Sequence, residues 1–397
     1  MIKQLHIENF RSIKKAGVPL GKFTVITGAN NCGKSSFIYS LLTLKNLVNN
    51  PNQSLDNFFV YGGLNLGGFT QTVFQKDLDL PIDLKVEVGG NGTQYRAVLN
   101  PKKSSLSLSL KGYGVFELGV AFPYPVNQKI SKPVEINNGK ADLIWNGVTG
   151  STYREDQPND LDSALKDIRS EIYLPAIELS KTDFIPARRG FSFPYYGTIP
   201  LQGQITTEEE IATLLAIDKD LTESVSYHLE KIIDSIFEVR STPEIANFYL
   251  EIREKNNAFV TNLVNEGSGT NQLVTMLAKI LYKNSKALCM DEPEIHLHPS
   301  IINRFVASLV EISDKEEKQF ILSTHSEQFL AALLRQVAEG KLAADDLCVY
   351  YLTKDKKGTT QFERQEVNNL GQIRGGYKSF LDAEMENLAS LFQLSEA

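Results

Sequence analysis

Cysteine is scarce in this chain, which has three among 397 residues. Cys32, Cys289 and Cys348 give no disulfide framework and fit a reducing compartment. Long apolar runs are also missing, because no stretch reaches the length that a bilayer-spanning helix needs. The N-terminus alternates like a strand and lacks the apolar core of a signal peptide. We therefore expect a cytoplasmic protein with no membrane partner.

An excess of basic residues is absent as well. The 41 Lys and Arg residues are outnumbered by 48 Asp and Glu residues, which gives a net charge of −7. This balance argues against a protein that coats nucleic acid with a wholly basic surface, but it does not exclude a local basic groove. The hydrophobic fraction of 42% and the charged fraction of 22% are ordinary for a globular protein. The length allows two or three domains, or one elaborated domain.

The most informative segment that is present runs from Gly28 to Ser35 and spells G-x-x-x-x-G-K-[ST]. We expect Gly28 and Gly33 to let the backbone turn tightly, so that successive N–H groups form a concave nest for the phosphates of ATP. Lys34 would place its charge over the β- and γ-phosphates, and the Ser35 hydroxyl would ligate Mg²⁺. The other nucleotide-contacting residues of this prediction are Ala29, Asn30, Asn31, Cys32 and Ser36.

The flanks of this loop agree with that interpretation. Residues 22–27 are typical of a buried strand, and residues 36–48 are typical of a helix whose N-terminal dipole end faces the phosphates. Cys32 inside the loop is either an oxidation-sensitive thiol or simply a small tolerated residue.

Two further strands end in residues that suit phosphate chemistry. Residues 286–290 are typical of a buried strand, with apolar residues from Ala287 to Met290 that run into Asp291 and Glu292, which is the pattern of a Walker B strand. Asp291 would enter the Mg²⁺ shell, and Glu292 would orient and polarise the attacking water. His325 follows the apolar strand 320–323 and could reach the γ-phosphate. Taken alone, the two acids could be a solvated strand end and the histidine could be structural.

The remaining pattern divides the chain into three predicted parts. Residues 1–150 form an N-terminal ATPase lobe, in which the strands at 82–88, 95–99 and 106–110 alternate as an antiparallel meander and 134–145 form a hairpin. Residues 151–240 are a mainly helical insertion, with a capping box at Thr207–Glu210 and an amphipathic helix at 221–237. Residues 241–397 are a C-terminal lobe in which strands and helices alternate, with a closing helix near 379–392.

These motifs together carry a resemblance. Residues 7–13, the loop 28–35, the run from Asp291 to Pro299 and the later Ser323–His325 resemble ATP-binding-cassette ATPases of the SMC and RecF type. More narrowly, they resemble the AAA-family ATPases related to OLD proteins, many of which belong to bacterial anti-phage systems. The resemblance covers about residues 1–75 and 245–375. It implies an α/β fold: an ABC-ATPase head with a P-loop core sheet, an antiparallel meander and the helical insertion.

The resemblance also implies further site residues. The segment Asn265–Gln272 occupies the place of the signature motif and keeps Gly267, Ser268 and Gly269, although it is not the usual LSGGQ. In the family this segment binds the γ-phosphate held by a second subunit. A glycine turn alone is the alternative. Arg11 matches a phosphate-contacting basic residue and could equally be solvated. Gln71 is the candidate Q-loop ligand of the metal, with Gln75 as its rival. His296 and His298 match a segment that meets the opposite subunit.

The function that the resemblance implies is that of an Mg²⁺-dependent ATPase that forms a homodimer through ATP, or a higher oligomer. OLD nucleases carry a Toprim domain after the ATPase, whereas 72 residues follow His325 here, so we expect no Toprim nuclease. We expect instead a sensor or regulatory subunit of an anti-phage defence system that controls a separately encoded nuclease or toxin, with phage DNA or a phage protein as trigger. The alternative is an SMC/RecF-like DNA-binding ATPase in DNA repair, for which Lys181, Arg188 and Arg189 could be a basic contact or structural arginines.

Overall fold

A computed structural model of the chain describes residues 1–374, apart from residues 52, 63, 202 and 204 and the segments 112–115, 123–129, 137–138, 154–162, 242–246 and 256–258. The chain divides into two compact units, and each is described by itself. The first comprises Met1–Leu20, Asn30–Thr182 and Leu352–Phe362. The second comprises Gly21–Ala29, Asp183–Tyr351 and Glu363–Ala397. The three-part division at residues 150 and 240 stays a prediction.

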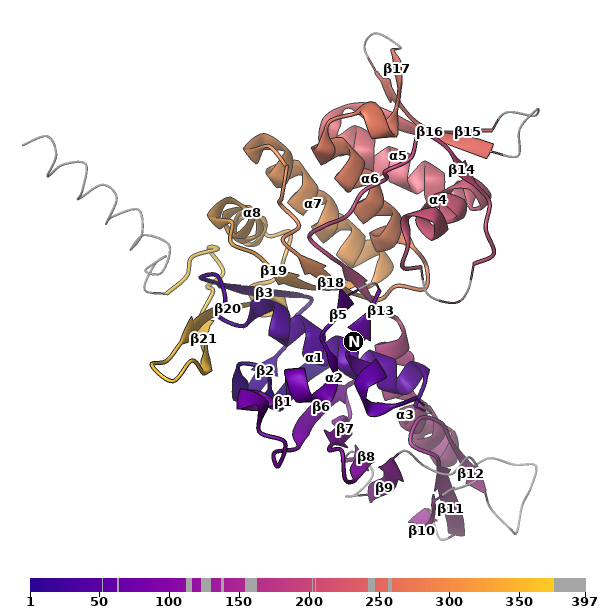
Figure 1. Cartoon of the computed structure of the whole chain (residues 1–397), viewed down its shortest axis with the longest axis vertical. Helices are drawn as coiled ribbons and strands as arrows, with labels where there is room; N and C mark the ends of the chain where they lie inside the picture. The colour runs from indigo at the N-terminus through magenta and orange to yellow at the C-terminus, as the bar shows by residue number, and fades with distance from the viewer. Residues whose placement is uncertain are drawn as a thin grey trace, which may run out of the picture. The chain divides into compact units, whose positions relative to one another are not determined.

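The first unit is built on an antiparallel sheet with the strand order β2-β1-β6-β7-β8-β9 (Figure 1). Every second side chain of β6 and β8 is buried, as the alternation of apolar and polar residues requires. The helices α1 (Lys34–Asn49) and α3 (Ser163–Ser180) pack on this sheet and on each other. The predicted meander is therefore confirmed. The strands are β1 (Ile2–Phe10), β2 (Ile13–Pro19), β6 (Ile82–Val88), β7 (Thr93–Leu99), β8 (Ser104–Leu110) and β9 (Phe116–Phe122).

Smaller elements complete this unit. A three-stranded sheet contains the predicted hairpin, whose strands pair from Ile130 with Trp145 to Ile136 with Gly139, while Asn138 of the turn lies outside the described residues. Its strands are β10 (Ile130–Ile136), β11 (Gly139–Trp145) and β12 (Gly150–Tyr153). Short elements follow α1, namely η1 (Leu55–Phe59), β4 (Val60–Tyr61), β5 (Leu64–Asn65), α2 (Gly68–Thr72) and η2 (Phe74–Lys76).

The second unit holds the central sheet, whose order is β13-β18-β19-β3-β20-β21. The strands β18, β19 and β3 lie wholly in this unit, and both pairs that they form are parallel. Their apolar runs are buried almost throughout, because a parallel sheet is covered on both faces. The strands are β3 (Phe23–Gly28), β13 (Thr182–Ile185), β18 (Ala287–Asp291), β19 (Gln319–Ser323), β20 (Leu347–Lys354) and β21 (Thr360–Gln365).

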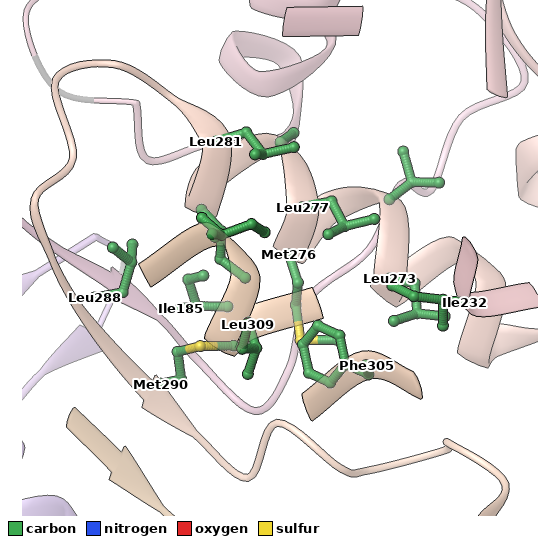
Figure 2. Close-up of a cluster of buried hydrophobic side chains, with 14 of the residues drawn as sticks. Ile185, Ile232, Leu273, Met276, Leu277, Leu281, Leu288, Met290, Phe305 and Leu309 are labelled. Atoms are coloured by element: carbon green, nitrogen blue, oxygen red, sulfur yellow. The ribbon is translucent and has the colours of Figure 1, made fainter. Parts of the chain in front are cut away.

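The helices of the second unit form its main hydrophobic core. Side chains from α6, α7 and β18 converge there, as Figure 2 shows for Leu273, Leu277, Phe305 and Met290. A second sheet of order β14-β16-β15, with β17 paired to β16, extends this unit. The helices are α4 (Glu208–Ile217), α5 (Lys219–Ile233), α6 (Ser268–Leu281), α7 (Pro299–Glu316) and α8 (Glu327–Ala338), with short turns η3 (Leu263–Asn265) and η4 (Ala344–Asp346). The strands are β14 (Tyr196–Gly197), β15 (Ser235–Ser241), β16 (Asn247–Glu254) and β17 (Val260–Asn262). Among the described helices, none has the length and apolar character needed to cross a membrane.

Several sequence-based predictions of elements need correction. Strands β2 and β21 were not expected. The helix predicted to reach residue 237 ends at Ile233, because Asp234 takes a left-handed conformation with φ of 57° and the chain then enters β15. The capping box at Thr207 and Glu210 is confirmed, with both of its hydrogen bonds present. The closing helix predicted near 379–392 lies outside the described residues.

The buried side chain of Lys318 is expected to stabilise the fold of the second unit. Its side chain is 1% exposed, and its ammonium group donates to the carbonyl oxygens of Ile280 and Tyr282 at the C-terminal end of α6, the second at 2.9 Å. Replacing Lys318 with methionine keeps the volume but leaves these buried carbonyls without their donor. We expect the free energy of unfolding to fall by about 1–3 kcal/mol, measured by urea denaturation. Lys315→Met on the exposed face of α7 should change it little, and equal losses in both variants would contradict this explanation.

Candidate functional site

Three neighbouring strands of the second unit end in register at one edge of the sheet (Figure 1). Ser323 at the end of β19 is paired with Ile26 of β3 on one side and with Asp291 of β18 on the other. The backbone N–H of Glu292 donates to the Ser323 carbonyl at 2.8 Å, and the Thr324 N–H donates to the Ile26 carbonyl at 3.1 Å. The same edge of the sheet therefore holds the start of the phosphate loop, the two acids and the segment that contains His325. In parallel α/β sheets this carboxyl edge is where ligands bind.

The phosphate loop has the backbone that an anion nest needs. Gly28, Asn31 and Gly33 all have positive φ, at 137°, 64° and 109°. Helix α1 begins at Lys34 with no side-chain cap and no acidic residue in its first turn. Its N-terminal amides are therefore not taken by a capping side chain, which fits a bound phosphate.

Gly33 is also required by packing within the first unit. A Cβ at this position would lie 2.5 Å from the Thr360 Oγ1 atom and 3.0 Å from the Ser12 Oγ atom. The Thr360 hydroxyl holds the loop by donating to the carbonyl of Cys32 at 2.9 Å. Cys32 itself is 3% exposed, which favours the interpretation as a small tolerated residue over an accessible thiol.

The other predicted loop residues differ in exposure. Lys34 and Ser36 are buried at 6% and Ser35 is partly buried, whereas the remaining three are exposed, namely Ala29, Asn30 and Asn31.

The two acids and the histidine come together within the second unit. The Ser323 hydroxyl donates to the Asp291 carboxylate, which fixes a hard oxygen donor of the kind that Mg²⁺ prefers. The Nε2 atom of His325 lies 3.5 Å from Oε1 of Glu292, and both side chains are about one third exposed. Glu292 has φ of 46°, so the chain turns sharply directly after β18. A carboxylate and an imidazole placed this way can orient a water molecule and accept its proton.

Arg189 is a member of this site that sequence reasoning did not assign. Its Nη1 atom donates to the carbonyls of Pro186 at 2.9 Å and Asp291 at 3.1 Å, and its Nη2 atom donates to the carbonyl of Glu292 at 2.9 Å. Burial lowers its pKa to about 10. Arg189 is therefore a structural arginine that fixes the backbone of both acids, whereas Arg188 is exposed.

Glu294 was also missed, although it belongs to the run of residues after β18. Its Oε1 atom accepts hydrogen bonds from the Thr324 hydroxyl and from the His325 N–H, the second at 3.3 Å. Burial raises the pKa of this carboxyl, and its Oε2 atom is buried without a partner. Glu294 thus ties the histidine segment to the segment that follows the acids. The only sequence signal was one more acid in a short acidic run.

The signature-like segment lies at the start of α6. Gly267 and Ser268 are exposed, and the helix has neither a side-chain cap nor an acidic residue in its first turn. Gly269 lies close to the segment that follows β18, because a Cβ at position 269 would lie 2.7 Å from the carbonyl oxygen of His296. The first turn of α6 therefore offers uncapped amides to the outside of this unit.

The remaining candidates are Arg11, Gln71, His296 and His298. Arg11 has φ of 52° and its guanidinium lies 5.4 Å from the centre of the Tyr39 ring, with Nη1 buried and without a partner. Gln71 is exposed on the short helix α2. His298 caps α7 by accepting from the Ser300 N–H, and His296 is exposed. Within the described part of the chain, no cluster of three or more His, Cys, Asp or Glu side chains could hold a metal ion. The ligand roles of all these residues stay predictions.

A family model described as an AAA ATPase domain matches residues 1–111 and 152–330. The chain belongs to this family. An OLD nuclease of Escherichia phage P2 is 24% identical to this AAA ATPase over an alignment 437 positions long. The alignment covers all of this chain and 65% of the nuclease. An ATP/GTP phosphatase of Helicobacter pylori is 20% identical, with 89% of this chain and 93% of that protein covered.

A solved structure of an SMC head bound to the C-winged helix domain of ScpA has a TM-score of 0.52 and 16% identity. The superposition covers 92% of this chain and 98% of the SMC head chain. The AAA ATPase chain therefore has an SMC-head-like ABC-ATPase fold, and the predicted fold class is confirmed. The resemblance to SMC and OLD ATPases is confirmed as well, at the level of family and fold.

Proposed function

We propose that this chain binds and hydrolyses ATP with Mg²⁺ and forms a homodimer through the bound nucleotide. The phosphate loop and Lys34 would hold the triphosphate, and Glu292 with His325 would position the attacking water. When bound, Mg²⁺ would neutralise phosphate charge, with Ser35, Asp291 and Gln71 as its ligands. The common carboxyl edge of β3, β18 and β19 supports this assignment.

The observation that supports dimerisation is the uncapped, exposed N-terminus of α6 at Gly267 and Ser268. A helix N-terminus attracts negative charge, and no side chain of its own first turn supplies any. We propose that it meets the γ-phosphate bound by a second copy, so that ATP joins two subunits and hydrolysis releases them. Each composite site then takes its phosphate loop from one chain and its signature-like turn from the other.

We propose further that the dimer is the sensor or regulatory subunit of an anti-phage defence system and controls a separately encoded effector, a nuclease or a toxin. Similarity to a phage-encoded OLD nuclease, of which this chain spans 65%, supports a place in that group of ATPases. Phage DNA or a phage protein would be the trigger. Co-purification of the chain with the product of an adjacent gene tests this part of the proposal, and purification of the ATPase alone under the same conditions would count against it.

A mixing experiment tests the composite site itself. Lys34→Ala removes the lysine of the phosphate loop, and Ser268→Glu places a negative charge where the second γ-phosphate would lie. Each variant alone should hydrolyse little ATP. Mixed, they restore one complete site in each heterodimer, so we expect phosphate release well above the sum of the separate rates. Because an acidic residue in a first helical turn stabilises the helix, Ser268→Glu should stay folded.

The matched control is Asn284→Asp, which adds the same charge at an exposed position beyond the C-terminal end of α6. Its ATPase rate should be close to that of the wild type. If Ser268→Glu retained full activity, or if the mixture gave only the sum of its parts, the shared site would be refuted.

An SMC/RecF-like DNA-binding role in DNA repair is the second candidate, favoured by the likeness to an SMC head. Salt-sensitive binding of duplex DNA by the purified dimer would support it, because contacts to phosphates release counterions. Binding that is absent at low salt would leave the regulatory role as the better account.

A further inference from the structure

A short segment of the second unit, Pro186–Phe191, connects two parts of the proposed machinery, and we call it the strap. It follows β13 and carries Arg189 near its middle. Arg189 donates to the carbonyls of Asp291 and Glu292 and, through Nη1, to Pro186 at the start of the strap itself. The guanidinium is planar, so these bonds fix its orientation relative to both acidic residues.

The other end of the strap is held by α6. The side chain of Asn271, in the first turns of that helix, accepts from the Phe191 N–H at 2.7 Å and donates to the Phe191 carbonyl at 2.9 Å. Asn271 is 9% exposed and the Phe191 ring is 4% exposed, so both bonds are shielded from water. Gly190 has φ of 131°, and a Cβ there would lie 3.0 Å from the Asn271 Oδ1 atom. The glycine thus permits the close approach of strap and helix.

One side of the strap borders open space. A cavity of about 400 Å³ is lined by strap residues together with Ser268, Gln272 and Thr275 of α6. At its far end the strap is part of the packed core, since the Phe191 ring is buried there, and a close-packed contact of this kind transmits displacement. Movement at the start of α6 would then reach the backbone of the two acids through few intervening groups.

We propose that the strap couples the two composite sites of the dimer, with Arg189 as a positioning residue for Asp291 and Glu292. This rests on the proposed function, in which α6 meets the nucleotide of the second copy while the acids serve the nucleotide of their own chain. Nucleotide binding at one site would shift α6, and the bonds of Asn271 would transmit this shift to Phe191. Arg189 would then reposition the backbone carbonyls of Asp291 and Glu292, and with them the two carboxylates at the other site.

The test measures ATP hydrolysis against ATP concentration for Arg189→Ala, Arg189→Lys and Asn271→Asp. Losing Arg189 should lower kcat about 10–100-fold, as loss of a group that orients ligands commonly does, with KM nearly unchanged. The Hill coefficient should fall from above one in the wild type toward one. Lysine keeps the charge but cannot make the paired bonds, so Arg189→Lys should restore little. Asn271→Asp keeps the shape and loses the donor to Phe191, and it should lower the Hill coefficient too.

The matched control is Arg240→Ala, which removes an exposed arginine of the same unit outside the strap and should leave kcat and the Hill coefficient unchanged. Light scattering with ATP separates the two proposals. If the Glu292→Gln variant, which should hydrolyse ATP slowly, does not form an ATP-dependent dimer, the proposed function fails. If it does, and Arg189→Lys and Asn271→Asp keep the wild-type kcat and Hill coefficient, the coupling by the strap is overturned. Equal melting temperatures for wild type and Asn271→Asp ensure that a change reports coupling and not unfolding.

Discussion

The variant Lys34→Ala is expected to lose ATP binding. Lys34 is the first residue of α1 and follows a loop with three left-handed positions, so we expect its charge at the mouth of the proposed nest. Removing a buried charge that contacts an anionic ligand commonly costs about 2–5 kcal/mol, which is roughly 30- to 5,000-fold in affinity. Isothermal titration with ATP and Mg²⁺ measures this loss directly.

Unfolding should not confound this result. Lys34 is 6% exposed, and burying a charge opposes folding, so alanine should not reduce the melting temperature greatly. Lys14→Ala, on the exposed side of β2 in the same unit, is the charge control and should bind ATP as the wild type does. An affinity for ATP that survives Lys34→Ala would mean that the loop is not the nucleotide site.

The second large effect concerns the water-activating acid. Glu292→Gln is expected to slow ATP hydrolysis by about 10²–10⁴-fold while ATP binding is retained, because an amide cannot accept the proton of the attacking water. The change leaves the backbone contacts of residue 292 with Ser323 and Arg189 in place. Single-turnover phosphate release, with saturation by ATP checked first, is the measurement. Glu223→Gln on the exposed face of α5 is the control.

Local signals in the sequence predicted much of what the structure contains. Strict alternation identified β6 with its correct ends, and the Thr207 capping box located the start of α4. The phosphate loop was recognised because its function needs particular residues at fixed spacing. These features depend on residues close together in the chain, and pattern alone reveals them.

The parts that sequence reasoning missed depend on contacts between distant residues. Arg189 meets the carbonyl of Glu292 across 103 positions, and nothing in the run Ala-Arg-Arg-Gly distinguishes it from Arg188. Helix α5 ends earlier than its apolar spacing suggests, because Asp234 adopts a left-handed turn and β15 then pairs with β16. In both places, tertiary contacts outweigh the local pattern.

The central claim is that ATP joins two copies of this chain, and the mass of the Glu292→Gln variant in solution tests it most directly. Light scattering of the purified variant with Mg²⁺ should give 44.3 kDa, the mass of one chain, without nucleotide and twice that mass once ATP is added. Adding Ser268→Glu to the same variant should return the mass to that of one chain, although ATP still binds. A Glu292→Gln protein that is saturated with ATP and still has the mass of a single chain would contradict the account.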